Sequence, residues 1–227
     1  MSRDPYGLAA VLFDMDGTLV DTEGLWWQAA ESVAAGLGYR LGEADVDDVL
    51  GRPVPHTAAH LHAVTGADRS PGALCVELDR RFAELVGRDS SGDGGGGIRP
   101  QPGALRLLDG LNEAGVPLAL VSASPRGVVD MVLRSLGGWR FALSVSADDT
   151  LRSKPAPDPY LAAVGALEAP AAACVAVEDT PTGVSSAEAA GCAVLAVPSR
   201  LPIQQGPGRT VVASLEEVDV ALLRSLA

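Results

Sequence analysis

The sequence predicts an α/β protein whose core is a doubly wound parallel sheet, with a small all-helical domain inserted after the first strand. Three observations predict this class. Short, continuously apolar runs end abruptly in polar residues, as strands covered on both faces do. Helical segments alternate with these runs after residue 98, whereas residues 22–88 show helical spacing and no strand. Hydrophobic residues make up 47% of the chain and charged residues 20%, which excludes a disordered or collagen-like protein.

The core elements follow one another in the order expected of such a sheet. The apolar runs that we predict to be strands are Leu8–Phe13, Val116–Val121, Phe141–Val145, Ala173–Val177 and Ala193–Val197. The spacing of apolar residues predicts helices over Gly103–Ala114, from a Ser124 cap with Pro125 as first residue to Leu136, and over Tyr160–Leu167 behind an Asp158 cap and Pro159.

The insert carries three predicted helices. The first begins behind a cap at Asp21 or Thr22, the second covers Val54–Val64, and the third opens at Ser70 and Pro71. A glycine-rich stretch follows, whose composition is typical of a flexible linker. We therefore expect a core domain of residues 1–21 and 98–227, a helical cap domain of residues 22–88, and a linker of residues 89–97.

Net charge and composition limit the classes of partner that the protein is expected to bind. The net charge of −12 and an aromatic content of 4% disfavour nucleic-acid binding, which needs basic contacts to phosphate or stacking platforms. No run approaches the roughly 18 apolar residues of a membrane-spanning helix, and the N-terminal run is too short for a signal peptide. Three widely spaced cysteines are typical of buried free thiols in a reducing compartment. We expect a cytoplasmic monomer without a membrane partner.

The predicted strands end in side chains that can bind a metal ion and a phosphate group. These residues are Asp14 and Asp16, Ser122, Asp148 and Asp149, and Glu178 and Asp179. Ligands of open α/β sheets bind beyond the carboxyl ends of the strands. Carboxylate oxygens without His or Cys are what Mg²⁺ prefers, and such a cation lets clustered carboxylates stay ionised together. Lys154, the only lysine, precedes Pro155 and can place a compact positive charge opposite a phosphoryl group.

Four segments resemble, in order and spacing, the four motifs of the haloacid dehalogenase (HAD) superfamily. They are Asp14-Met15-Asp16-Gly17-Thr18-Leu19-Val20-Asp21, Val121-Ser122, Lys154-Pro155-Ala156-Pro157-Asp158-Pro159-Tyr160 and Val177-Glu178-Asp179-Thr180. The match spans nearly the whole chain. The insert is similar to the small helical cap of the subgroup that contains β-phosphoglucomutases and sugar-phosphate and phosphoglycolate phosphatases. The resemblance implies a Rossmann-like HAD core.

The resemblance also implies a reaction, the hydrolysis of a small phosphorylated metabolite. Asp14 is expected to attack phosphorus and form an aspartyl-phosphate. Asp16 is expected to act as general acid to the leaving group and then as general base to water. Ser122 and Lys154 are expected to hold the phosphoryl oxygens and offset their charge.

The implied cofactor is Mg²⁺. It is expected to bind Asp14, the backbone carbonyl of Asp16, and Asp179, with Glu178 bound directly or through water. The metal lets the anionic nucleophile and the anionic phosphate approach each other. Thr18, from the same first motif, is expected to bind the substrate.

Other activities of the superfamily fit the sequence less well. Hydrolytic dehalogenases lack the second aspartate of the first motif, and phosphonatases need a cap lysine that is absent here. β-Phosphoglucomutases carry a cap histidine at the position of Trp26 and a cap lysine, and neither is present. Hydrolysis is therefore favoured, and mutase-like phosphotransfer remains the alternative. A non-catalytic member that binds a phosphorylated metabolite also stays open, although the complete set of motif residues weighs against it.

Three further residues are candidates for substrate contact. Arg52 lies in a segment, Leu50–Val54, that resembles the specificity loop of the family; the alternative is a surface arginine bonded to a helix end. Ser124 and Arg126 follow the second motif and can reach the distal part of a substrate. Their alternatives are a helix N-cap and a solvated residue of the first helical turn.

The histidines of the insert are candidate ligands for a zinc site. His56 and His60 share a helical face, but no third matching ligand or glutamate base accompanies them. The sequence therefore disfavours a zinc site and does not give these histidines a role.

Overall fold

The structure is a computed structural model that describes residues 7–90 and 98–227. The chain divides into two compact units. The core unit comprises the described residues of Met1–Asp21 and Arg99–Ala227, and the cap unit comprises those of Thr22–Ile98. Of the linker expected at residues 89–97, the first two residues end a helix, and residues 91–97 lie outside the described part of the chain.

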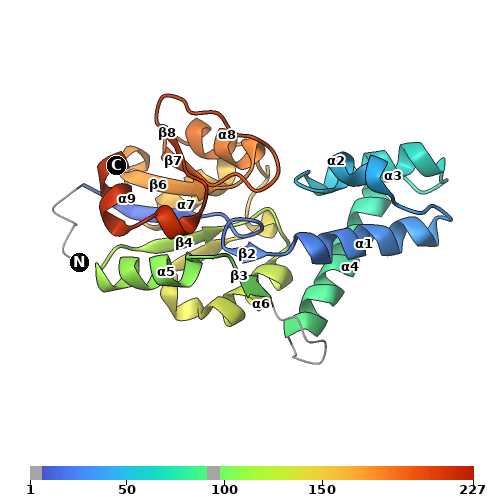
Figure 1. The fold of residues 1–227 in the computed structure, drawn as a ribbon, viewed down its shortest axis with the longest axis horizontal. Coiled ribbons are helices and arrows are strands. Elements are labelled where there is room, and N and C mark those ends of the chain that lie inside the picture. The colour runs from blue at the N-terminus through green and yellow to red at the C-terminus, as the bar shows by residue number, and fades with distance from the viewer. Residues whose placement is uncertain (1–6, 91–97) are drawn as a thin grey trace. The chain divides into compact units, whose positions relative to one another are not determined.

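A six-stranded parallel sheet forms the centre of the core unit, in the order β5-β4-β1-β6-β7-β8 (Figure 1). Its strands are β1 (Ala10–Phe13), β4 (Leu118–Val121), β5 (Leu143–Val145), β6 (Cys174–Glu178), β7 (Ala193–Ala196) and β8 (Arg209–Val211). These strands, apart from β8, confirm the five predicted runs, and three of the runs begin two residues too early. Strand β8 is too short and too polar to stand out in the sequence.

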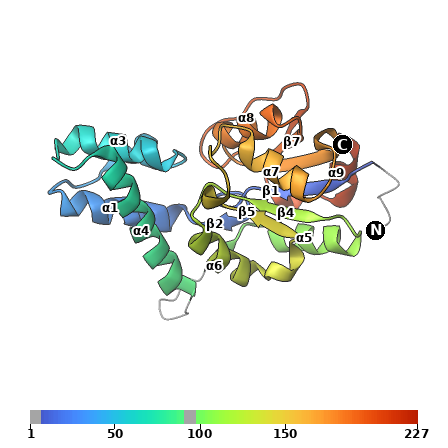
Figure 2. The same ribbon diagram turned by 180° about the vertical axis from the view of Figure 1, so that it is seen from behind.

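Helices cover both faces of this sheet, so the doubly wound prediction is confirmed. Helices α7 (Asp158–Ala166) and α8 (Pro181–Ala189) pack on one face, where Tyr160, Ala163 and Val184 join the core. Helices α5 (Ala104–Glu113), α6 (Arg126–Leu136) and α9 (Val220–Leu226) lie on the other face, as Figures 1 and 2 show. The strand order reverses at β1, and the carboxyl end of a strand at such a point is where open sheets bind ligands.

A small antiparallel pair carries the chain out of the core unit and back. Strand β2 (Val20–Asp21) pairs with β3 (Arg99–Pro100), so that Val20 lies opposite Pro100. The two crossings between the units are therefore side by side, as an insertion into an intact core requires.

The cap unit contains only helices among its described residues. They are α1 (Glu23–Gly36), α2 (Val46–Val49), α3 (Val54–Thr65) and α4 (Pro71–Ser90), with a short 3₁₀ turn at Glu43–Asp45. Their apolar faces form a separate core around Ala30, Leu61 and Leu78. Trp26 packs its ring edge-on against Phe82 at 5.6 Å, which gives this indole a structural place.

The predicted helix caps were only partly right. The helix after the second strand begins at Arg126 with Pro125 as N-cap, and no side chain caps it; Ser124 bonds elsewhere. Asp158 lies inside α7 rather than before it, and its carboxylate pairs with Arg152. Both sequence positions fit a cap equally well, but partners outside the helix, Asp16 for Ser124 and Arg152 for Asp158, compete for the side chains.

Cys174 and Cys192 are buried free thiols, as expected, and burial raises the pKa of Cys174 to about 11. Among the described residues no helix is both long enough and apolar enough to cross a membrane.

Candidate active site

The sheet itself places the first site residues. Asp14 directly follows β1, and its amide donates to the Val177 carbonyl at 2.9 Å, so the ladder continues one residue beyond the strand. Ser122 follows β4 in the same way, with its amide donating to the Val145 carbonyl at 2.9 Å. Neighbouring parallel strands thus bring both side chains to the carboxyl edge of the sheet.

Lys154 lies at the centre of this edge. Its ammonium donates to Asp14 Oδ1 at 2.6 Å, to Glu178 Oε1 at 2.6 Å and to the Val121 carbonyl at 2.9 Å. Three acceptors match the three N–H donors of an ammonium. Burial opposes the charged form, but Asp14 and Glu178 outweigh it and hold the pKa of Lys154 above its ordinary value. The lysine is therefore a fixed positive charge.

Three carboxylates surround this charge. One oxygen each from Asp14, Glu178 and Asp179 lie within 4.8 Å of one another, and all three residues are buried. The cluster carries more negative charge than one ammonium can offset. Burial and the neighbouring carboxylates accordingly raise the pKa of Asp179 well above its ordinary value.

Glu178 is held from two sides. Tyr160 donates to Glu178 Oε1 at 2.5 Å, and the Lys154 ammonium lies 5.2 Å from the centre of the Tyr160 ring. On the other side Gly183 leaves room, because a Cβ there would overlap the Glu178 carboxyl group. Burial raises the pKa of Glu178 to about 7, although Lys154 and Tyr160 act in the opposite direction.

The donor set fits a hard divalent cation such as Mg²⁺. Within the described residues, Asp14 Oδ2 and Glu178 Oε2 are buried without a hydrogen-bond partner, which is costly for charged oxygens. Clustered carboxylate oxygens are the ligands that Mg²⁺ takes, and a bound cation would satisfy these atoms and relieve the repulsion in the cluster.

Asp16 faces a different set of groups. Ser124 donates to Asp16 Oδ2 at 2.8 Å, and Ser122 approaches the same oxygen at 3.4 Å. The Ser124 amide in turn donates to the Ser122 hydroxyl at 2.9 Å. The side chain of Asp16 is therefore not in the acidic cluster and is oriented by two serine hydroxyls.

Arg126 forms hydrogen bonds and an ion pair within the core unit. Its guanidinium bonds Ser144 Oγ at 2.7 Å and pairs with Asp149, and its amide donates to Asp148 at 2.8 Å. Asp149 thus neutralises the Arg126 guanidinium and Asp148 accepts from its backbone amide, so both of these residues after a strand stay outside the acidic cluster. The substrate contact predicted for Arg126 would require it to leave these bonds.

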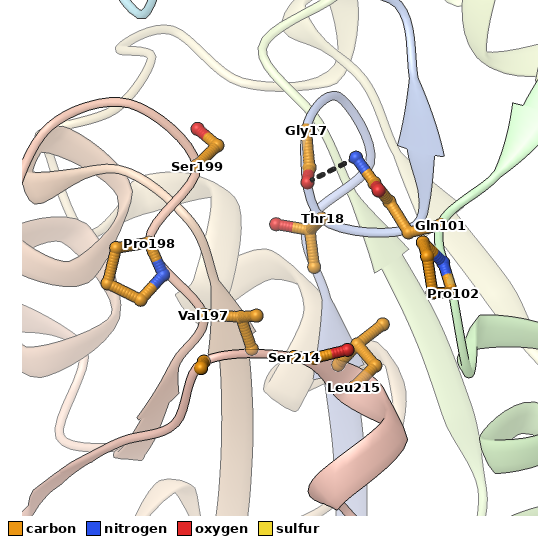
Figure 3. A pocket seen from close by; sticks show the side chains of 10 residues that line it. Gly17, Thr18, Gln101, Pro102, Val197, Pro198, Ser199, Ser214 and Leu215 are labelled. Atoms are coloured by element: carbon orange, nitrogen blue, oxygen red, sulfur yellow. Dashed lines mark hydrogen bonds between the residues drawn. The ribbon is translucent and has the colours of Figure 1, made fainter.

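Thr18 lies beside a cavity in the core unit. The cavity has a volume of about 190 Å³ and is bounded by the Gly17–Thr18 loop, the loop at Val197–Ser199 and the segment at Ser214 (Figure 3). The Thr18 hydroxyl is buried and has no hydrogen-bond partner among the described residues. Gln101 closes one side by donating to the Gly17 carbonyl at 3.1 Å. The substrate contact predicted for Thr18 stays a prediction.

The remaining candidates belong to the cap unit. Arg52 donates to the Asp47 carbonyl at 2.9 Å, which is the alternative that the sequence left open. His60 bonds Asp45 at 2.7 Å and His56 bonds Asp48 at 2.8 Å, so each histidine has a carboxylate partner. The described residues contain no histidine metal cluster, and these pairs hold α3 against the segment before it.

Sequence reasoning missed Ser199. Its hydroxyl donates to Asp179 Oδ2 at 2.7 Å. The residue follows β7 closely, so the rule that identified the other strand ends could have found it. No motif marks the position, and only the fold shows that it reaches Asp179.

Fold and site together define a Rossmann-like α/β enzyme with a lysine-paired aspartate beside an acidic cluster. Residues 11–197 match the family model described as haloacid dehalogenase-like hydrolase. Hexitol phosphatase A of Escherichia coli is 33% identical over 92% of each chain, and phosphoglycolate phosphatase of Rhodospirillum rubrum is 32% identical over 91% of this chain and 83% of its own. The crystal structure of CbbY from Rhodobacter sphaeroides in complex with phosphate superimposes with a TM-score of 0.80 at 26% identity, covering 95% of this chain and 99% of that chain. The chain belongs to the haloacid dehalogenase-like hydrolase family and is an enzyme of its phosphatase type.

Proposed function

We propose that this protein is a Mg²⁺-dependent phosphatase that hydrolyses a small phosphorylated metabolite through an aspartyl-phosphate on Asp14. The observation that carries the proposal is the Asp14 carboxylate, with one oxygen bonded to Lys154 at 2.6 Å and the other buried without a partner. A carboxylate held in this way is oriented for attack on phosphorus.

The first half-reaction transfers the phosphoryl group to Asp14. A bond forms between an Asp14 oxygen and phosphorus while the bond from phosphorus to the substrate oxygen breaks. Asp16 gives its proton to the leaving alkoxide, and the hydroxyl of Ser124, 2.8 Å away, holds Asp16 in place. Ser122 and Lys154 hold the phosphoryl oxygens and offset their charge, and Lys154 exchanges one of its three present acceptors for a phosphoryl oxygen to do so.

The second half-reaction releases phosphate. Asp16, now ionised, takes a proton from the attacking water, a bond forms between the water oxygen and phosphorus, and the bond to Asp14 breaks. Lys154 stays charged throughout, because the carboxylates around it hold its pKa high.

The cation belongs at the acidic cluster. Asp14, Glu178 and Asp179 would hold Mg²⁺, together with the Asp16 backbone carbonyl that the family resemblance implies. When bound, Mg²⁺ supplies the positive charge that lets an anionic carboxylate approach an anionic phosphate ester. This charge balance also explains why one chain buries three carboxylates beside a single ammonium.

Two features support a sugar phosphate or similar phosphomonoester as substrate and water as acceptor. The relatives at 32–33% identity include phosphatases named for hexitol and phosphoglycolate. Trp26 is part of the packing of the cap unit against Phe82, at the position where mutases carry a histidine.

The test is release of phosphate from a panel of sugar phosphates, hexitol phosphates, phosphoglycolate and nucleotides, with and without Mg²⁺. We expect turnover of at least one phosphorylated sugar or small acid, loss of turnover in EDTA, and none in Asp14→Asn. Absence of turnover on the whole panel would favour a non-catalytic binding protein. Faster conversion of β-glucose 1-phosphate in the presence of a bisphosphate primer than phosphate release would instead identify a mutase.

A further inference from the structure

We propose that Ser199 is a positioning residue that orients Asp179 toward the divalent cation; this inference rests on the proposed Mg²⁺ dependence. The Ser199 hydroxyl donates to Asp179 Oδ2 at 2.7 Å, and the Ser199 amide lies 3.4 Å from the Asp179 backbone carbonyl. The loop after β7 therefore donates hydrogen bonds to both the main chain and the side chain of Asp179.

Gly17 leaves room for the same carboxylate oxygen. A Cβ on Gly17 would overlap Asp179 Oδ2 and would lie 3.6 Å from Ser199 Oγ. Figure 3 shows Gly17 and Ser199 on loops that face each other across the upper part of the cavity. Asp179 Oδ2 therefore accepts a hydrogen bond from Ser199 and occupies space that a side chain at position 17 would fill.

A hydrogen-bond donor to Asp179 offsets part of the repulsion within the acidic cluster. Asp179 shares its site with Asp14 and Glu178, and like charges at this distance repel each other. Lys154 bonds the other two carboxylates directly, whereas Asp179 receives its side-chain hydrogen bond from Ser199. Hydrogen bonds to a ligating carboxylate fix its orientation and are worth about 10- to 100-fold in metal affinity.

Mg²⁺ affinity of the full-length protein measures this role without turnover. We would titrate MgCl₂ by isothermal calorimetry into the wild type and into Ser199→Ala, Ser199→Val and Ser199→Thr. Threonine keeps the hydroxyl, and valine has nearly the same shape without it. Ser199 is exposed, so the added methyl groups have room. The control is Ser185→Ala, whose hydroxyl donates to the Pro181 carbonyl on the exposed side of α8.

We expect the dissociation constant for Mg²⁺ to rise about tenfold in the alanine and valine variants and less than about threefold in the threonine variant. The KM for p-nitrophenyl phosphate at saturating Mg²⁺ should stay at the wild-type value, as should every property of the control. Alanine and valine variants that bind Mg²⁺ like the wild type would overturn the inference, even if their melting temperature fell. A wild type that binds no Mg²⁺ would overturn the proposed cofactor and this inference with it, so the two failures are distinguishable.

Discussion

Replacing Lys154 by methionine should destabilise the metal-free protein strongly. The substitution keeps a long side chain but removes the ammonium that bonds Asp14, Glu178 and the Val121 carbonyl. Glu178 is fully buried and Asp14 nearly so, which leaves water little access to either carboxylate. Removing one partner of a buried ion pair costs about 3–5 kcal/mol, and two carboxylates lose their partner here. We expect a loss of at least about 3 kcal/mol in the free energy of unfolding near neutral pH.

Urea unfolding in EDTA, followed by circular dichroism, measures this loss. The matched control is Arg209→Met, because Arg209 forms a two-bond pair with Glu188 at 2.7–2.8 Å in a more exposed part of the core unit. That pair should contribute about 1 kcal/mol or less. Adding Mg²⁺ should restore part of the stability of Lys154→Met, since the cation binds only the folded cluster. A Lys154→Met variant no less stable than the control would refute the charge balance inferred for the site.

Three further predictions test neighbouring parts of the site. Because burial raises the pKa of Glu178 from 4.5 to about 7, its ionisation opposes folding, and the metal-free protein should lose about 3 kcal/mol of stability between about pH 4.5 and about pH 7.5. Urea titrations in EDTA should show this loss, and Glu178→Gln should reduce it; a flat profile in the wild type would contradict the assignment. Ser124→Ala should lower kcat about tenfold with little change in KM, because Asp16 loses its 2.8 Å donor, and an unchanged kcat would show that Asp16 needs no such support. Gly183→Ala should cost about 1–3 kcal/mol in thermal unfolding because its Cβ displaces the Glu178 carboxyl group, whereas a wild-type melting temperature would mean that the helix yields instead.

The sequence predicted the parts of this protein that depend on local pattern. Continuous apolar runs identified five of the six strands of the main sheet, because a buried parallel strand needs apolar residues on both faces. The ends of those strands identified Asp14, Ser122 and Asp179, since the sheet brings its carboxyl ends to one edge. Lys154 was found because it is the only lysine, and the structure places it between two of the predicted carboxylates.

The remainder depends on partners far apart in the chain. Ser124 fits a helix cap locally, but its hydroxyl bonds Asp16, 108 residues away. Asp149 also follows a strand, yet Arg126 neutralises it, which no local pattern shows. Ser199 acts on Asp179 across 20 residues and belongs to no motif. Strand β8 pairs with β7, and its three residues show no strand pattern of their own.

The central claim is that Asp14 becomes phosphorylated, and a single-turnover experiment on Asp16→Asn tests it most directly. p-Nitrophenyl phosphate has a leaving group that needs no proton, so this variant should complete the first half-reaction and stall for lack of a general base. We predict a burst of one nitrophenolate per enzyme with Mg²⁺ present, and a phosphorylated peptide containing Asp14 by mass spectrometry. Steady turnover without a burst, or a phosphoryl group on any other residue, would contradict it.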